Sequence, residues 1–416
     1  MNEGCIPTKT LLRSAEVMHL VKARAHEFGV RGVDPHAITF DLPAAVARKD
    51  AIIQGIIDGI YTALKRNTNI TFITGRAELT SPVDIRVDGK RFSAGKIILA
   101  VGSQPAPTNI PGLEEAGYIT NYEALSLEKL PASMIVIGAG YEGVEFAQMY
   151  ARFGTKVTLL GRAPRVMPGA EPELSERLGE ILRAEGVDLH TSTVAVRAGI
   201  QNGQRFVIAR SGDVEQRFEA EVFLKVTGRI ARLTGLGLEQ AGVQVVGDFV
   251  KTDAQLRTTA ANIWSIGDAN GGYMFTHRAT YDGPYAALNA VRGLDKAVDY
   301  RVVPWAVFTE PALASVGLTE EQARREGYEV KVGKAFFAHS GRAKAIGQTE
   351  GLVKLVADGR TGELLGGHIL GPHADILIHE VMATMYNHGT AEAIAKSIHI
   401  HPTLPEVLKS AARALG

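Results

Sequence analysis

Both ends of the 416-residue chain carry residues that could do thiol and proton chemistry. Near the front, the run Met1-Asn2-Glu3-Gly4-Cys5-Ile6-Pro7-Thr8-Lys9 places the sole cysteine at the expected start of a helix, with Lys9 one turn later. A helix N-terminus and a nearby ammonium group both favour a thiolate over a thiol. Near the end, His401 precedes Pro402 and is followed, five residues on, by Glu406. A carboxylate in that position can orient an imidazole for proton transfer.

A glycine turn in the middle of the chain is a third candidate site. The apolar run 134–137 predicts a buried parallel strand, and residues 144–153 predict a helix. Between them stand Gly138, Gly140 and Gly143, in the spacing Gly-x-Gly-x-x-Gly. In this context the glycines allow a tight turn, backbone approach to a pyrophosphate and close helix packing. We therefore predict a dinucleotide site in preference to a purely structural turn.

The residues after the next expected strand, 156–160, bear on which dinucleotide binds. A ribose-binding acid is expected at this point, but Gly161-Arg162-Ala163-Pro164-Arg165 contains no carboxylate. The guanidinium groups of Arg162 and Arg165 suit a 2′-phosphate, which they can hold through charge-assisted hydrogen bonds. The sequence therefore favours NADPH, with NADH possible. Two solvated loop arginines are the alternative interpretation.

Periodicity predicts the elements that position these residues. We expect a helix from Pro7 to about Phe28, a second helix over 44–66, and short strands within 70–101. Residues 262–268 predict a strand that ends at Gly267-Asp268 and is followed by a helix through Ala290. After Pro304 the pattern changes to strands at 305–308, 313–317, 329–338 and 351–357 and helices at 374–388 and 391–397.

Composition limits the classes of protein that the chain can represent. With 45% hydrophobic residues, 45 glycines and 6% aromatics, it fits a multidomain α/β protein. The 45 basic and 45 acidic residues balance, which argues against a nucleic-acid partner or a membrane surface. One cysteine excludes an internal disulfide and a thiolate-rich metal cage. No apolar run could span a bilayer and no secretory signal is visible, so we expect a cytoplasmic protein without a metal site.

The motifs occur in the order found in the flavin-dependent pyridine nucleotide-disulfide oxidoreductases, and the chain resembles that family over nearly its whole length. They are Gly-Cys-Ile-Pro-Thr-Lys at residues 4–9, the glycine turn, Gly267-Asp268, and His401-Pro402-Thr403-x-x-Glu406. The resemblance implies an α/β fold with two Rossmann-like nucleotide-binding domains and a C-terminal α+β dimerisation domain. The implied divisions are 1–130 for the first part of a truncated FAD-binding domain, 131–257 for the NAD(P)-binding domain, 258–302 for the return of the FAD-binding domain, and 303–416 for the interface domain.

The resemblance also implies residue roles. Cys5 would be the flavin-proximal thiol, Lys9 would pair with Glu145, and Tyr141 would cover the nicotinamide pocket. Asp268 would hydrogen-bond the ribityl chain of FAD, and the cofactor-binding set also includes Gly228 and Gly267. His401, oriented by Glu406, would exchange protons with the interchange thiol at the flavin of the partner subunit, because the family is homodimeric.

The sequence departs from the family at its front. The family motif is Cys-x-x-x-x-Cys, and its first cysteine would fall before residue 1, as would the first βαβ unit with the FAD pyrophosphate glycines. We expect a misassigned start and an impaired short form. Within the family, the His-Glu pair favours a lipoamide-like disulfide substrate, as in dihydrolipoamide dehydrogenase. The alternatives are a mercuric reductase-like enzyme, which would have a C-terminal cysteine pair and a Tyr in place of His401, and a catalytically inactive truncated dimeric nucleotide-binding protein.

Overall fold

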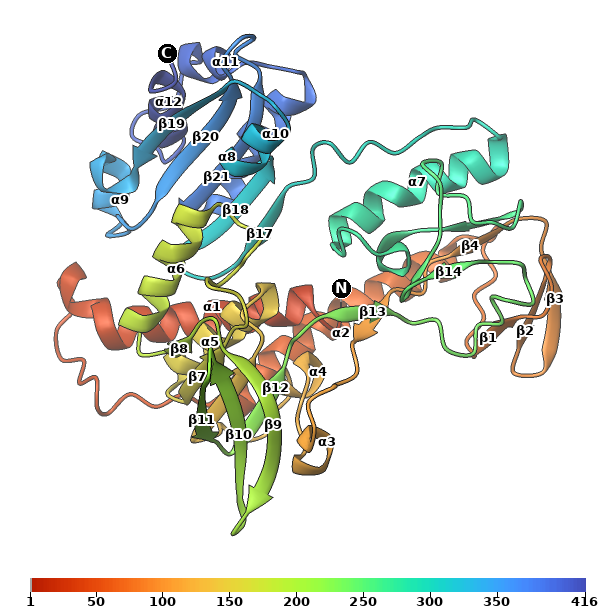
Figure 1. The fold of residues 1–416 in the computed structure, drawn as a ribbon, viewed down its shortest axis with the longest axis horizontal. Coiled ribbons are helices and arrows are strands. Elements are labelled where there is room, and N and C mark those ends of the chain that lie inside the picture. Colours follow the sequence, from red (N-terminus) through yellow and green to blue (C-terminus); the bar gives the residue numbers. More distant parts are fainter. Residues whose placement is uncertain (1) are drawn as a thin grey trace. The chain divides into compact units, whose positions relative to one another are not determined.

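The computed structural model describes residues 2–416 and contains two compact units, each built from separate stretches of chain (Figure 1). The smaller unit combines Ala51–Pro107 with Gly228–Tyr300. The larger unit combines Asn2–Asp50, Thr108–Thr227 and Arg301–Gly416. The boundaries of these two units differ from those of the four expected domains. The domain boundaries therefore remain a prediction.

A four-stranded parallel sheet belongs to the larger unit. Its order is β12 (Val222–Lys225), β6 (Ser133–Ile137), β7 (Lys156–Leu160) and β8 (Asp188–His190). Helix α5 (Tyr141–Phe153) joins β6 to β7, and α6 (Pro172–Ala184) joins β7 to β8. The predicted strand–turn–helix–strand unit is therefore present. A parallel sheet needs such crossovers, and helices on its face bury its apolar side chains.

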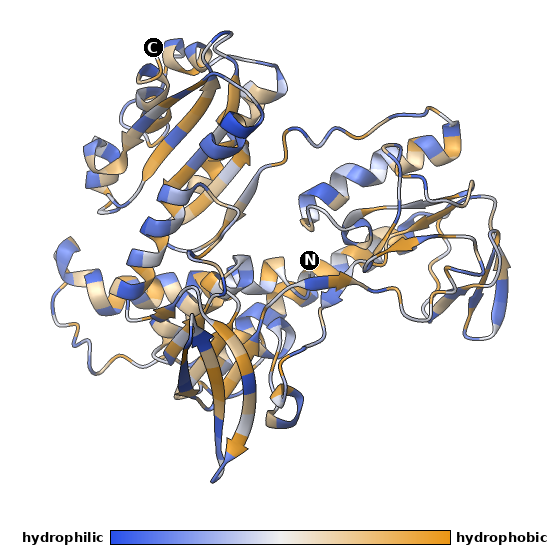
Figure 2. Ribbon diagram, in the orientation of Figure 1, coloured by the Kyte–Doolittle hydropathy of each residue, from blue (hydrophilic) through white to orange (hydrophobic). Residues whose placement is uncertain are grey.

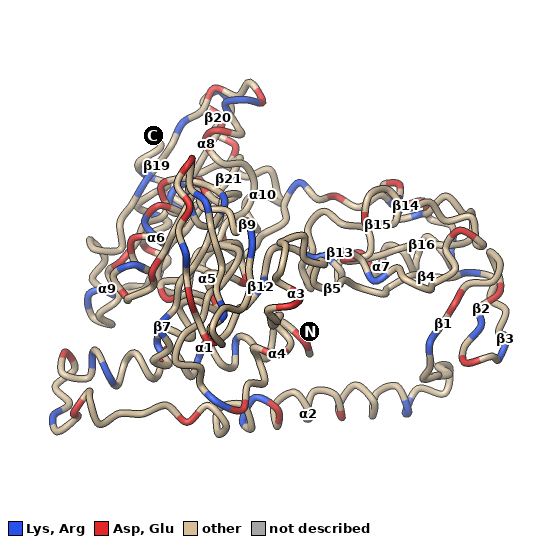
Figure 3. Tube along the Cα trace, turned by 60° about the horizontal axis from the view of Figure 1, so that its bottom comes forward, with Lys and Arg blue, Asp and Glu red and all other residues tan. Residues whose placement is uncertain are grey.

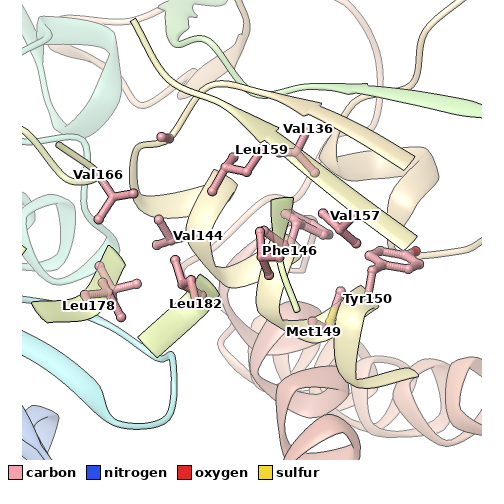
Figure 4. Packing of buried hydrophobic residues seen from close by; sticks show 14 of the residues in the cluster. Val136, Val144, Phe146, Met149, Tyr150, Val157, Leu159, Val166, Leu178 and Leu182 are labelled. Atoms are coloured by element: carbon pink, nitrogen blue, oxygen red, sulfur yellow. The ribbon is translucent and has the colours of Figure 1, made fainter. Parts of the chain in front are cut away.

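Apolar side chains from α5, α6 and the parallel strands make one core. Figure 4 shows Val136 and Leu159 from the sheet pointing toward Val144 and Phe146 of α5, with Leu182 of α6 beside them. All five are almost inaccessible to solvent. Burial on this scale contributes about 1.5–3 kcal/mol per large aliphatic or aromatic side chain. The core therefore fixes the turn that contains the three glycines. An antiparallel meander of β9 (Val194–Gln201), β10 (Gln204–Ser211) and β11 (Val214–Glu219) precedes β12.

The cysteine-bearing helix packs on α5. Helix α1 (Cys5–His19) continues through a π-helical turn (Leu20–Arg24) and a 3-10 turn (Ala25–Phe28), so the predicted helical stretch to Phe28 is confirmed. Its apolar face buries Leu11, Ala15 and Met18, and α1 and α5 are in direct contact.

The C-terminal part of the larger unit is an antiparallel sheet covered by helices. Its order is β17 (Trp305–Val307), β18 (Ala312–Gly317), β21 (Leu364–Gly371), β20 (Leu352–Asp358) and β19 (Val330–Phe336). Helix α10 (Ala374–Tyr386) packs on β18 and β21, and α12 (Glu406–Arg413) packs on β19 and β20. The short helices are α8 (Glu320–Arg325), α9 (Gly341–Ala345) and α11 (Ala391–Lys396). In Figure 2, apolar colouring follows β20, whose first six residues are buried. The predicted mixture of strands and helices in this part is confirmed, but β21 and α12 were not predicted.

The smaller unit is made of short strands and one long helix. Strands β1 (Ala77–Leu79), β2 (Asp84–Val87) and β3 (Lys90–Ser93) pair antiparallel, and β4 (Ile97–Leu99) pairs parallel with β16 (Ile263–Ser265). Two further pairs are β5 (Ser103–Pro105) with β13 (Arg229–Ala231) and β14 (Val245–Val246) with β15 (Phe249–Val250). Helix α7 (Thr276–Arg292) follows β16. Helix α2 (Leu42–Arg66) begins in the larger unit and ends in this one. The strands expected within 70–101 begin only at Ala77, and Ile70, Phe72 and Ile73 are exposed outside any strand.

Charges of both signs are interspersed along the chain (Figure 3), in line with its formal net charge of zero. Within residues 2–416, no helix combines the length and the apolar character needed to cross a membrane.

Candidate functional site

The segment that precedes α1 is held by backbone and side-chain contacts. Gly4 is the N-cap, and Cys5 is the first helical residue, with an exposed side chain. The amide of Thr8 donates to the carbonyl of Gly4 at 3.1 Å, and the side-chain amide of Asn121 donates to the carbonyl of Glu3 at 2.9 Å. Cys5 therefore lies at a fixed helix N-terminus.

Lys9 connects α1 to α5 through Glu145. Its Nζ atom lies 2.9 Å from each carboxylate oxygen of Glu145, and the Glu145 side chain is only 5% exposed. The backbone amide of Phe308 donates to the same carboxylate at 2.8 Å, and the Phe308 ring centre lies 4.5 Å from the Lys9 Nζ. The carboxylate thus has two donors, as a buried charge requires. Phe308 belongs to the connection after β17, and nothing in the sequence pointed to it.

The glycine turn has the shape that a pyrophosphate needs. At Gly138, where φ is +115°, a Cβ would lie 2.7 Å from the carbonyl oxygen of Val226, and at Gly143 it would lie 1.8 Å from that of Gly138. At Gly140 a Cβ would meet no atom within 4 Å. Two glycines are therefore required by packing, whereas Gly140 lines open space at the N-terminus of α5, where a phosphate is favoured. A nicotinamide dinucleotide fits this arrangement.

Two further groups lie near the same end of the parallel sheet. Tyr141, the first residue of α5, is 39% exposed and packs edge-on against Trp305, with ring centres 5.2 Å apart. Arg162 follows β7, is exposed, and makes no side-chain hydrogen bond or ion pair within residues 2–416. Arg165 makes a loose 3.6 Å ion pair with Glu176, which is 61% exposed. Such surface pairs contribute little, so both guanidinium groups can reach an added phosphate.

The Gly267-Asp268 motif lies in the smaller unit, in a 3-10 turn (Gly267–Asn270) after β16. The hydroxyl of Ser103 donates to the Asp268 carboxylate at 2.6 Å, and the Arg229 Nε donates to the Ser103 hydroxyl at 2.9 Å. Gly267 has φ +65°, and a Cβ there would lie 2.9 Å from the Cβ of Ala279. Gly228, with φ +129°, accepts a hydrogen bond from the amide of Ala106 at 3.0 Å.

A buried polar network holds the backbone of this turn. Asp282 accepts from the amide of Gly267 at 3.0 Å, and Arg278 donates to the carbonyls of Gly267 and Gly271, both at 2.9 Å. Tyr300 donates to Asp282 at 2.6 Å, and burial together with that hydrogen bond raises the pKa of Tyr300. A fixed carboxylate at a strand end suits the hydroxyls of a ribityl chain, so these residues fit FAD. No sequence signal pointed to Arg278, Asp282 or Tyr300.

His401 and Glu406 form a pair near the C-terminus. The His401 Nδ1 lies 3.0 Å from Glu406 Oε1, and the amide of Thr403 donates to Glu406 Oε2 at 2.9 Å. The hydrogen bond from His401 is the main reason that the pKa of Glu406 is lowered. With Nδ1 turned to Glu406, the other ring nitrogen, Nε2, faces outward from a side chain that is 79% exposed. This geometry leaves Nε2 able to exchange a proton with a bound substrate.

The structure thus brings Cys5, Lys9, Glu145 and the glycine turn onto the adjacent helices α1 and α5, and it joins His401 to Glu406 in the C-terminal part. Within residues 2–416, no group of three or more His, Cys, Asp or Glu side chains is suited to hold a metal ion.

Two family descriptions match the chain. "Pyridine nucleotide-disulphide oxidoreductase" matches residues 1–283, and the dimerisation domain of the same family matches residues 303–412. The dihydrolipoyl dehydrogenase of Chlorobaculum tepidum is 39% identical over 99% of this chain and 88% of its own length. That of Bacillus subtilis is 33% identical over 99% of this chain and 89% of its own length.

Solved structures agree with the sequence relatives. The HOCl-induced flavoprotein disulfide reductase RclA from Escherichia coli is similar with a TM-score of 0.87 and 29% identity, covering 100% of this chain and 91% of that one. These findings confirm the predicted α/β fold, the flavoprotein disulfide oxidoreductase class, and the family's cofactors FAD and NAD(H). The chain belongs to the pyridine nucleotide-disulphide oxidoreductase family.

Proposed function

We propose that the chain is an FAD-dependent NAD(P)H:disulfide oxidoreductase of the dihydrolipoyl dehydrogenase kind. It would carry the nicotinamide site and a thiol, and its substrate would be a lipoamide-like disulfide. The observation that carries the proposal is the Lys9–Glu145 contact, which joins the cysteine-bearing helix α1 to α5, the helix that follows the glycine turn. Electrons that pass between a nicotinamide and a disulfide need these two sites to be adjacent. The two relatives named above, 39% and 33% identical, are dihydrolipoyl dehydrogenases.

Each set of residues would have its own part in that reaction. Gly138, Gly140 and Gly143 would bind the pyrophosphate of the nicotinamide nucleotide, and Tyr141 would cover its ring. Bound FAD would supply the two-electron chemistry between nicotinamide and sulfur. The Asp268 carboxylate, with Gly267 and Gly228 in the same unit, would orient it.

The sulfur side would use Cys5 and the His401–Glu406 pair. Lys9 would add positive charge on the helix that begins with Cys5, and His401 would move a proton through Nε2. A thiol-disulfide centre needs two sulfur atoms, and residues 1–416 contain one cysteine. The second sulfur of each cycle must therefore come from the substrate or from a residue outside this sequence.

The dinucleotide preference forms a finer part of the proposal. Arg162 and Arg165 would bind a 2′-phosphate, favouring NADPH although NADH remains usable. Arg162 supports this assignment because its guanidinium group has no competing partner within residues 2–416.

The remaining parts concern organisation. We propose that 1–130 and 258–302 serve FAD, 131–257 serves the nicotinamide nucleotide, and 303–416 forms the interface of a homodimer in which His401 acts at the flavin of the partner subunit. The dimerisation-domain match over 303–412 supports the last assignment. A cytoplasmic location belongs to the same proposal.

The test is to purify the protein with FAD and to follow two reactions separately. Flavin reduction by NADPH or NADH reports the nicotinamide side, and NAD(P)⁺-dependent oxidation of dihydrolipoamide reports the sulfur side. We expect both in a protein that has its second sulfur, with oxidised glutathione and Hg(II) as poor alternatives. If neither NADPH nor NADH reduced the bound flavin, the proposal would be refuted. The alternative would then be a catalytically inactive dimeric nucleotide-binding protein.

A further inference from the structure

The loop between α11 and α12, residues 397–405, turns most of its side chains outward. Ile398 is 100% exposed and Ile400 is 78% exposed, and the His401 side chain is 79% exposed. The His399 side chain, between the two isoleucines, is only 7% exposed. His399 is thus the inward anchor of a loop that presents His401 two residues later.

Both ring nitrogens of His399 have partners. Its Nε2 lies 3.0 Å from Oε1 of Glu380 on α10, and its Nδ1 lies 3.2 Å from the carbonyl oxygen of Ser397. The Lys409 ammonium on α12 donates to that same carbonyl. The imidazole therefore ties the loop to α10, and Lys409 ties it to α12.

A second set of contacts, made by Thr403, spans His401. The hydroxyl of Thr403 donates to the carbonyl of Ile400 at 2.6 Å, and its amide donates to Glu406. His401 accordingly lies between two anchored points, His399 before it and Thr403 after it. Removing the His399 side chain would take away the contact of this stretch to α10, while the hydrogen bonds to the carbonyls of Ser397 and Ile400 would stay.

Glu380 provides a rigid support because α10 is fixed by the core of the C-terminal sheet. On its inner face the helix buries Leu377, Ile378, Val381 and Met385. Glu380 lies on the outer face, and its side chain is 33% exposed. The His399–Glu380 contact therefore relates the loop to a helix that packs on the core of this domain.

We propose that His399, held by Glu380, is a positioning residue for His401. The inference rests on the proposed function, in which His401 exchanges a proton with the sulfur centre. Proton transfer needs the imidazole within hydrogen-bond reach of the sulfur-bound proton. A misplacement of about 1 Å can cost up to about 10²-fold in rate. His399 touches neither substrate nor flavin in this scheme and acts only through the loop.

The first experiment compares His399→Phe with His399→Gln in the FAD-loaded protein. Phenylalanine keeps a ring but cannot donate to Glu380, whereas the glutamine amide still can. We expect His399→Phe to slow dihydrolipoamide oxidation by about tenfold or more, with flavin reduction by the nicotinamide nucleotide unchanged. His399→Gln should restore most of the lost rate.

A second experiment removes the partner carboxylate and has a matched control in the same domain. Glu363 pairs with His388 at 2.8 Å and is 34% exposed, close to the 33% of Glu380. Glu380→Ala should slow the sulfur half-reaction and speed amide hydrogen exchange at Ile400 and His401. Glu363→Ala should do neither.

Light scattering should show the same assembly state for wild type and both glutamate variants. Unchanged exchange at Ile400 and His401 in Glu380→Ala would overturn the inference, and so would a loss of the dimer in place of a slowed half-reaction. If the wild type oxidised no dithiol at all, the proposed function would fall, while the exchange measurement would still decide whether the anchor holds the loop.

Discussion

The Lys9 Nζ lies 2.9 Å from both carboxylate oxygens of Glu145, although 136 residues separate them in the chain. Glu145 is 5% exposed and Lys9 is 32% exposed, so the pair is only partly screened by water. The contact fixes the register of α1 against α5. In this way it relates the position of Cys5 to that of the glycine turn.

The first prediction concerns this pair. Lys9→Met should lower the free energy of unfolding by about 1–3 kcal/mol, below the ~3–5 kcal/mol of a fully buried pair because Lys9 is one-third exposed. Arg13→Met is the matched control on the same helix, because the Arg13–Glu16 pair is 61% and 37% exposed, and it should cost less than about 1 kcal/mol. Urea titration measures both. Equal losses would mean that the Lys9 contact has no special role.

The glycine turn gives a second prediction, with one glycine as the control for another. Gly143→Ala should destabilise the protein, because its Cβ would lie 1.8 Å from a backbone oxygen that cannot move freely. Gly140→Ala should melt near the wild-type temperature, since a Cβ there meets nothing within 4 Å. It should nevertheless bind the dinucleotide weakly, because the pyrophosphate approaches through that space. Tight nucleotide binding by Gly140→Ala would place the pyrophosphate elsewhere.

The third prediction tests the choice between NADPH and NADH. Arg162→Glu should weaken NADPH by about one to two decades, since a hydrogen bond to a charged group contributes about 1.5–3 kcal/mol, and NADH should bind as well as before or better. Arg177→Glu, on the exposed side of α6 where it pairs with Glu180, is the control and should alter neither. Calorimetric titration of both nucleotides measures this. A loss shared equally by NADPH and NADH would show that Arg162 does not contact the 2′-phosphate.

A buried lysine in the C-terminal sheet gives the fourth prediction. Lys354 on β20 is 5% exposed and pairs with Glu171, which is 3% exposed, and with Glu320. Lys354→Met should cost about 3–5 kcal/mol, because it leaves the Glu171 charge buried without its cation. Lys334, directly opposite Lys354 on β19, makes a surface pair with Glu173 in which both side chains are 38% exposed. Lys334→Met should therefore cost at most about 1 kcal/mol in the same unfolding titration. Similar losses would mean that burial does not set the strength of these pairs.

The pH dependence of that pair follows from the pKa of Lys354. Burial lowers this pKa, but the hydrogen bonds to Glu171 and Glu320 outweigh burial and raise it above its ordinary value of 10.5. A raised folded pKa means that the stabilisation is fully present below 10.5 and is lost as the pH rises through the folded value. The difference between wild type and Lys354→Met should hence be constant near neutral pH and shrink only in strong alkali.

The sequence predicted the parts of the fold that depend on neighbouring residues. The run 134–137, the three glycines and the helix after them form one local unit, and strand β7 spans the predicted residues Lys156–Leu160. The same reasoning expected strands from residue 70, yet Ile70 and Phe72 lie exposed outside any strand. Apolar β-forming residues need a neighbouring strand to pair with, and no strand within residues 2–416 pairs with this stretch.

Site residues that depend on distant backbone could not be predicted. The amide of Phe308 reaches Glu145 across 163 residues, and a backbone donor has no sequence signature. His399 was visible beside His401, but only the fold brings it to Glu380 on another helix. The sequence therefore singled out candidate groups for the chemistry, whereas the contacts of Phe308 and Glu380 became visible only in the fold.

The fifth prediction separates the two halves of the proposed reaction at His401. His401→Ala should slow dithiol–disulfide interchange by ~10²–10⁴-fold, the usual range for general acid–base help, because Nε2 is the free ring nitrogen once Nδ1 faces Glu406. Flavin reduction by the nicotinamide nucleotide should stay near wild type, since that step needs no proton from this imidazole. The same variant should return the pKa of Glu406 toward its ordinary value, because the His401 hydrogen bond is the largest cause of its lowering. Stopped-flow traces measure the two half-reactions and carboxyl NMR the titration. Equal slowing of both half-reactions would assign His401 to structure instead of proton transfer.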